Sequence, residues 1–314
     1  NPHQNAVLGA MQLCEHAKLP FMILPERTIT DELLKQFQVL LLPEVFVIQE
    51  DIAEMLRNYA DNGGLIISSG QSGLWNADSS RRPASSIADL LGIGHTEIHT
   101  EYKANRWSAY LKNVSQRDFS GLLSCTTPPV SEHFMETEPA GSAEVLLHLI
   151  LPCVSCDDRH WVNWWSPPPG TDSGYPALIR NTVGSGITFY LAFDFFTMAS
   201  TEEFSDTGSL FEDLLAMENI KPVLYNRTKT PDIIRTAYFE TKDSYIIHQI
   251  STIPKHFHGQ LSPVEGGTLE LKCKISGAEM VYPKKKTLEI CTDTDGTVVM
   301  LPELSLQQII VCKK

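Results

Sequence analysis

The 314-residue sequence lacks any apolar run long enough to cross a membrane. Its longest apolar stretches, Val39–Pro43 and Val145–Pro152, fall far short of the roughly 20 residues that a membrane helix needs. It also lacks an initiator methionine and a signal-peptide pattern, so we expect a piece of a longer protein. The composition, 42% hydrophobic and 20% charged, excludes a largely disordered chain and suffices for two domains.

Positive charge is scarce, with 25 Lys and Arg against 38 Asp and Glu and a net charge of −13. Nucleic-acid affinity comes mostly from basic side chains that neutralise phosphates, so we expect neither a nucleic-acid nor a membrane partner. The deficit is uneven: residues 1–222 carry a net −15, whereas residues 223–314 carry a net +2. This shift predicts a domain boundary near Pro222.

Cysteine is also sparse, because seven cysteines over this length exclude a disulfide-stapled miniature fold. Cys14, Cys273, Cys291 and Cys312 sit in apolar runs, which predicts buried thiols. The run Cys153-Val154-Ser155-Cys156 is a lone CxxC without the second pair that a zinc site requires. We therefore predict no metal and no cofactor. The cysteines do not indicate the cellular compartment of the protein.

Up to Pro222, segments with helical spacing alternate with short apolar runs typical of strands. Such alternation predicts an α/β domain, with a parallel sheet covered by helices on both faces. The predicted helices are Ala6–His16, Thr30–Phe37, Ile48–Tyr59 and Ser209–Met217, and the predicted strands are Val39–Leu42, Leu65–Ser69, Glu144–Leu151 and Ile187–Phe193.

After Pro222 the pattern changes to short alternating runs separated by turn residues such as Asp293-Thr294-Asp295-Gly296. About 90 residues of this kind predict a small antiparallel all-β sandwich over residues 223–314. The predicted strands are Ile233–Phe239, Tyr245–Ile250, Thr268–Ile275, Leu288–Cys291, Thr297–Leu301 and Gln307–Cys312.

Two patterns in the sequence offer a candidate catalytic site and a candidate metal site. Ser69-Gly70-Gln71-Ser72-Gly73 follows a predicted strand, where an exposed nucleophile would lie in an α/β fold, but it does not fit G-x-S-x-G. A glycine-rich strand exit is the favoured interpretation. His95, Glu97, His99 and Glu101 would share one face of a strand and so offer metal ligands, although solvent-facing polar residues give the same pattern.

The most unusual segment is residues 157–170, in which three of the five tryptophans lie within five residues, ahead of three consecutive prolines. This composition predicts a rigid loop. Flat aromatic faces beside hydrogen-bonding side chains suit a sugar ring or a protein interface, although the tryptophans can instead pack on their own domain. The candidate substrate-binding residues are Asp157, Arg159, His160, Trp161, Trp164 and Trp165. No carboxylate pair for glycoside hydrolysis can be singled out, so no catalytic residue is predicted.

A resemblance to a known family rests on the runs Gly9-Ala10, Leu19–Leu24, Leu40–Glu44, Tyr59–Ile66, Ala88–Ile93, Pro176–Leu178 and Gly184–Leu191. These runs resemble the β-galactosidase trimerisation domain, the module that follows the catalytic TIM barrel in family 42 β-galactosidases and related glycosidases. The resemblance implies a flavodoxin-like, three-layer parallel-sheet domain of the class I glutamine amidotransferase-like fold over residues 1–222. The β domain over residues 223–314 resembles the C-terminal sandwich of the same enzymes.

The resemblance further implies a non-catalytic portion of a glycoside hydrolase, with an upstream barrel, homo-oligomeric assembly and carbohydrate as partners. Such a module opens with a strand before its first helix, which residues 1–5 are too short to supply. We therefore expect the first strand to be missing and upstream chain to complete the sheet. A self-standing serine hydrolase using Ser69 or Ser72, and a carbohydrate-binding module, are the alternatives.

Overall fold

The computed structural model describes residues 2–102, 107–119, 127–131, 133–155, 167–201, 205–221, 224–226, 234–251, 263–294 and 296–314. The chain divides into two compact units. One comprises residues 1–13 and 23–220, and the other comprises residues 14–22 and 221–314.

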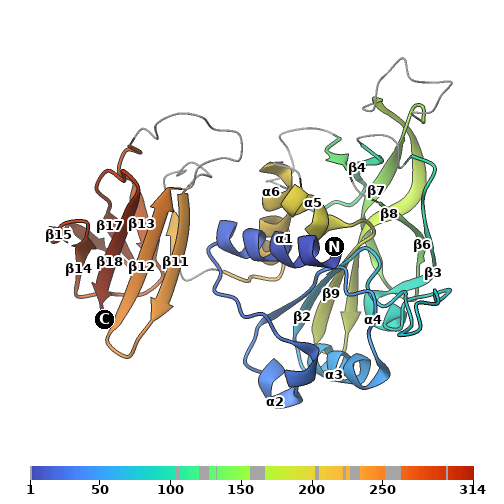
Figure 1. Ribbon diagram of the computed structural model, residues 1–314, viewed down its shortest axis with the longest axis horizontal. Helices are drawn as coiled ribbons and strands as arrows, with labels where there is room; N and C mark the ends of the chain where they lie inside the picture. Colours follow the sequence, from blue (N-terminus) through green and yellow to red (C-terminus); the bar gives the residue numbers. More distant parts are fainter. Residues whose placement is uncertain are drawn as a thin grey trace. The chain divides into compact units, whose positions relative to one another are not determined.

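The helices belong almost entirely to the first unit (Figure 1). They are α1 Pro2–His16, whose last residues fall in the second unit, the 3-10 turn Glu26–Thr28, α2 Asp31–Leu34, α3 Glu50–Asp61, α4 Ala88–Leu91, α5 Phe195–Thr201 and α6 Ser205–Met217. Within the described residues, none of these helices has the length and apolarity to span a membrane.

A seven-stranded sheet forms the centre of the first unit, in the order β1-β2-β9-β8-β7-β4-β5. A separate two-stranded sheet pairs β3 with β6. The strands are β1 Val39–Leu42, β2 Leu65–Ser69, β3 Ile93–Ile98, β4 Ala109–Asn113, β5 Pro129–Val130, β6 Met135–Pro139, β7 Glu144–Pro152, β8 Pro169–Val183 and β9 Gly186–Leu191.

The prediction of a parallel sheet is right for β1, β2 and β9 and wrong for the remaining strands. β1 pairs with β2 and β2 with β9 in parallel, whereas β8, β7, β4 and β5 join antiparallel. The change of direction begins at a tight hairpin, where Val183 pairs with Gly186 across Gly184 and Ser185. Gly184 has φ +56°, a conformation that glycine adopts without steric cost, and so permits this turn. The sheet is therefore mixed.

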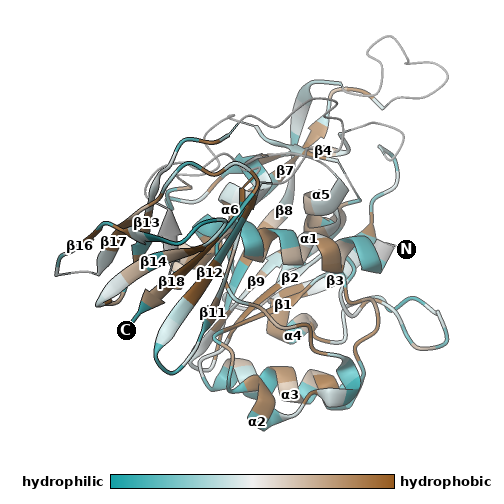
Figure 2. Cartoon of the chain, turned by 60° about the vertical axis from the view of Figure 1, so that its left-hand side comes forward, coloured by the Kyte–Doolittle hydropathy of each residue, from teal (hydrophilic) through white to brown (hydrophobic). Residues whose placement is uncertain are grey.

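The amphipathic α3 shows how the first unit builds its core. Ala53, Leu56 and Ala60 are buried on one side of the helix, and the other side carries exposed polar residues, so both colours alternate along α3 in Figure 2. The buried side packs in one cluster with Ile66 of β2 and Tyr190 of β9. α1, α5 and α6 lie together and apart from α2 and α3 in both views (Figures 1 and 2).

The second unit consists of two antiparallel sheets, as its alternating runs predict. Side chains from both sheets form one core, including Ile247 and Ile310 from the five-stranded sheet and Leu269 and Val299 from the four-stranded sheet. The sheets are β11-β12-β18-β14-β15 and β10-β13-β17-β16, with β10 Leu224–Asn226, β11 Ile234–Glu240, β12 Ser244–Ser251, β13 Thr268–Leu271, β14 Gly277–Tyr282, β15 Lys286–Leu288, β16 Ile290–Thr292, β17 Thr297–Met300 and β18 Gln307–Lys313.

The cysteine prediction is confirmed only in part. Cys14 and Cys312 are buried, and burial raises the pKa of each thiol to about 12, which keeps both protonated at neutral pH. Cys273 is half-buried and Cys291 is exposed, since β16 is an edge strand. The prediction of a buried thiol is therefore wrong for Cys291.

Candidate functional site

The candidate substrate-binding residues, Asp157, Arg159, His160, Trp161, Trp164 and Trp165, all lie outside the described residues, as does Cys156 of the CxxC. The chain on either side of them is hydrogen-bonded to other parts of the first unit. Ser155 Oγ donates to the Glu101 carbonyl at 3.0 Å, and the Tyr110 hydroxyl donates to the Pro167 carbonyl. Cys153 N also donates to Pro168 O at 3.0 Å. Residues 153–155 and 167–168 are thus held by hydrogen bonds at one edge of the first unit, where β7 and β8 pair.

An aromatic and acidic cluster lies beside this edge. The His99 ring stacks on Phe134, with ring centres 4.3 Å apart, and on Tyr102, with ring centres 5.4 Å apart. Its Nδ1 is hydrogen-bonded to Glu136, and a further hydrogen bond to Glu136 raises the pKa of Tyr175. The cluster therefore gathers aromatic rings and hydrogen-bonding groups around His99.

The structure does not bring the four candidate metal ligands together. β3 ends at Ile98 and has an irregular register between Ile93 and Thr96, so the four side chains do not follow one strand face. His95 and Arg81 both contact Glu97 at the surface, whereas His99 turns towards Glu136. Within the part of the chain that the structure describes, no three His, Cys, Asp or Glu side chains form a metal-binding group.

The Ser69–Gly73 turn, which is the candidate site of a serine nucleophile, lies at the carboxyl end of β2. Ser69 and Ser72 are fully buried, at 0% and 1% exposure. Ser69 Oγ donates to Glu44 Oε1 at 2.5 Å, and Ser72 Oγ bonds the backbone of the same turn. These hydroxyls hold the turn closed and are out of reach of a substrate, which argues against the serine hydrolase alternative.

Glu44 and Asp194, two residues that the sequence did not single out, meet at this end of the parallel strands. Both are buried. Glu44 Oε1 accepts from Phe196 N and Oε2 from Thr197 N, each at 3.1 Å, so the carboxylate caps the start of α5. Gly70, at φ +55°, allows the approach, because a Cβ there would lie 2.2 Å from Asp194 Oδ1.

The electrostatics of the pair follow from burial. Burial, and then the Asp194 carboxylate, raises the pKa of Glu44 to about 7, against the hydrogen bonds from Ser69, Phe196 and Thr197. Burial also raises the pKa of Asp194, with His133 acting in the opposite direction at 3.5 Å. Through the hydrogen bonds from Ser69, Phe196 and Thr197, the Glu44 carboxylate stabilises the junction between β1, β2 and α5.

The proximity of Glu44 and Asp194 can be predicted from their positions in the sequence. Glu44 follows β1 by two residues and Asp194 follows β9 by three. Parallel strands end at the same edge of a sheet, so polar residues just after two such strands are expected to meet.

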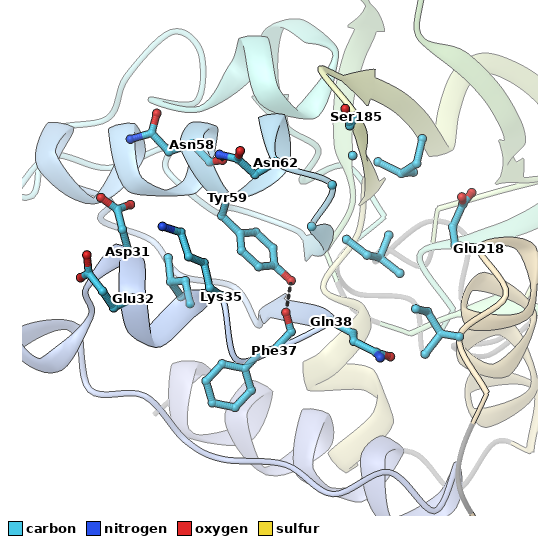
Figure 3. Close-up of a pocket in the computed structure, with 17 residues that line it drawn as sticks. Asp31, Glu32, Lys35, Phe37, Gln38, Asn58, Tyr59, Asn62, Ser185 and Glu218 are labelled. Carbon is cyan, nitrogen blue, oxygen red and sulfur yellow. Dashed lines mark hydrogen bonds between the residues drawn. The ribbon is translucent and has the colours of Figure 1, made fainter. Parts of the chain in front are cut away.

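A separate hollow of about 600 Å³ lies at the opposite, amino-terminal ends of β1, β2 and β9 (Figure 3). α2, α3 and the residues that directly follow each of them supply most of its polar side chains. Figure 3 shows the Tyr59 hydroxyl bonded to the Phe37 carbonyl, at 3.2 Å. Its main polar lining residues are Asp31, Glu32, Lys35, Gln38, Asn58, Asn62, Ser185 and Glu218.

Comparison with known proteins places the fold among glycosidases. No protein-family model matches the sequence, and no curated protein does. An α-L-fucosidase isoenzyme 2 from Paenibacillus thiaminolyticus aligns over 98% of this chain at 16% identity with a TM-score of 0.74. A β-galactosidase from Bacillus circulans sp. alkalophilus aligns over 99% at 17% identity with a TM-score of 0.64. The GH42 β-galactosidase Gan42B from G. stearothermophilus aligns over 98% at 11% identity with a TM-score of 0.62.

The chain spans less than half of each of these proteins: 45% of the fucosidase, 37% of the Bacillus enzyme and 36% of Gan42B. Both units take part in the likeness, since it extends over nearly all of the chain. At these identities the likeness concerns the fold, and the chain has the fold of a portion of glycoside hydrolases.

Proposed function

We propose that this chain is a non-catalytic portion of a glycoside hydrolase, which holds protomers together and supports an active site carried by another part of the polypeptide. The observation that carries the proposal is the likeness to glycosidases over 98–99% of this chain but only 36–45% of theirs. The remainder of such an enzyme would be an upstream TIM barrel bearing the catalytic carboxylates. A flavodoxin-like layering and assembly as a homo-oligomer, such as a trimer, belong to the same proposal.

The burial of Ser69 and Ser72 supports a non-catalytic role. At the carboxyl ends of the parallel strands, the buried Glu44 carboxylate is engaged in capping α5. This arrangement favours a structural role for these residues over a catalytic one.

The outer edge of β1 is where the sheet would be completed. Among the described strands β1 pairs on one side only, with β2, and an exposed strand edge is a template for another strand. The apolar run after α1 lies nearby in sequence and stays exposed, with Phe21 at 42%, Met22 at 61% and Ile23 at 56%. We propose that an upstream strand of the same polypeptide joins β1 in parallel.

The tryptophan-containing segment is proposed to wall the active site. Trp161, Trp164 and Trp165 would stack on sugar or on the barrel, and Asp157, Arg159 and His160 would donate or accept hydrogen bonds. The hydrogen bonds of Ser155 to Glu101 and of Tyr110 to Pro167, on the two sides of the segment, support this proposal.

Replacing Trp164 and Trp165 together by alanine in the complete enzyme is expected to raise KM about tenfold or to dissociate the protomers, because aromatic anchors carry much of the energy of such contacts. Steady-state kinetics and analytical ultracentrifugation measure the two effects. Phenylalanine at both positions is the matched control and should keep most of the effect of the rings. Unchanged KM and unchanged assembly in the alanine variant would refute the proposed role.

A further inference from the structure

We propose that the hollow at the amino ends of β1, β2 and β9 binds a neutral sugar of one or two rings. Its volume of about 600 Å³ falls within the roughly 300–1,000 Å³ typical of small-molecule sites. All of its lining residues belong to the first unit. The choice of a sugar among neutral ligands rests on the proposed link to a glycoside hydrolase, whereas the pocket itself does not.

The inner wall of the pocket is apolar and preformed. Leu34, Tyr59 and Leu65 are buried, with exposures of 1%, 8% and 4%, and they lie behind the polar rim. Gly64 fixes the Tyr59 ring, because a Cβ at Gly64 would lie 2.2 Å from that ring. Tyr59 lines the hollow together with Leu34 and Leu65, so its ring adds to an apolar wall against which the less polar side of a sugar can pack.

In the described part of the chain, the polar side chains of the rim fall into two groups, those already paired within the protein and those left unpaired. Asn62 Nδ2 donates to Asn58 O at 2.7 Å, and Glu218 pairs with Arg180 at 2.8 Å. Within the described residues no hydrogen bond or ion pair engages the side chains of Asp31, Glu32, Lys35, Gln38 and Asn58, which α2, the start of β1 and α3 bring to one opening (Figure 3).

The chemistry of this rim selects a neutral, hydroxylated ligand. The side chains of Gln38 and Asn58 each combine a donor and an acceptor, and the Asp31 carboxylate accepts from hydroxyl groups. Asp31 and Glu32 outnumber the single amine, Lys35, so the rim repels phosphates and sugar acids. A ligand with several hydroxyl groups and one apolar face matches both rim and wall.

Titration of the 314-residue chain with lactose, followed by ¹H–¹⁵N NMR, tests the proposal. We expect a Kd of about 1 mM, with shifts at residues of the pocket. Gln38→Ala and Asn58→Ala should each weaken binding about fivefold through the loss of hydrogen bonds. Gln36→Ala and Glu54→Ala are matched controls, because both residues are exposed, lie on the same segments and are not part of the lining, and both should leave Kd unchanged.

The proposal is overturned if lactose gives no shifts up to about 50 mM, if inorganic phosphate binds as tightly, or if the pocket and control variants weaken binding equally. Asn58 is exposed, so its variant should keep the melting temperature of the parent chain, which separates lost binding from lost folding. Lactose-induced shifts at residues of the pocket report this site alone, whereas KM and assembly of the Trp164→Ala, Trp165→Ala enzyme report the proposed role of the tryptophan-containing segment. Failure of the pocket and failure of the proposed assembly role are thereby distinguished.

Discussion

Replacing Glu44 by alanine should lower the free energy of unfolding by about 3 kcal/mol. The substitution removes the acceptor for Ser69 Oγ and for the backbone N–H groups of Phe196 and Thr197, all of which are buried. Each buried donor left without a partner costs roughly 1–3 kcal/mol, partly offset because a buried carboxylate is no longer desolvated. Urea denaturation at pH 7 measures the change.

Glu54→Ala is the matched control for this variant. Glu54 is exposed on α3, and its removal should change the free energy of unfolding by less than about 0.5 kcal/mol. Glu44→Gln should fall between the two variants, because the amide keeps one acceptor oxygen and presents an NH₂ group to the other donors. Equal stability of the Glu44→Ala and Glu54→Ala chains would show that Glu44 does not secure the start of α5.

Stability should fall as the pH rises from 5 to 8, by up to about 3 kcal/mol. The pKa of Glu44 is raised from its ordinary 4.5 to about 7, so in this window the folded state binds more protons than the unfolded state. The contribution is fully present below the unfolded pKa and is lost as the pH rises through the folded value. Asp194, whose pKa burial also raises, acts with the same sign. Urea denaturation at several pH values measures the slope.

Asp194→Asn should make this slope shallower, since it removes one buried acid and its repulsion on Glu44. His133→Asn, measured alongside, removes the contact with Asp194 Oδ2 at 3.5 Å while both carboxyls remain. The carboxylates with lowered pKa values, such as Asp89 and Glu144, lose their contribution only as the pH falls below this window. A slope unaffected by Asp194→Asn would remove the carboxyl pair as its origin.

Local patterns were enough to predict most of the elements. The apolar runs at Val39–Leu42 and Leu65–Ser69 became β1 and β2, and the helical stripe from Ile48 to Tyr59 became α3. The direction of the strands was predicted less well, because alternating helices and strands do not reveal a hairpin such as β8–β9. The Gly184-Ser185 pair was the available sign of that hairpin.

The candidate sites depended on contacts between distant segments. The sequence predicts a glycine-rich strand exit at Ser69–Gly73, but it does not show that the buried Ser69 hydroxyl bonds Glu44, 25 residues earlier. The pocket draws on α2, α3, the β8–β9 hairpin and the end of α6, so no single stretch of sequence carries its pattern. The role of Trp161, Trp164 and Trp165 stays a prediction.

The mass of the native polypeptide that contains this sequence tests the central claim most directly. Intact mass spectrometry on protein captured with an antibody against the second unit gives that mass. A polypeptide longer than this 35.1 kDa chain by roughly 250 residues or more, the size of a barrel, is the predicted result. A native mass equal to that of the chain would contradict the account.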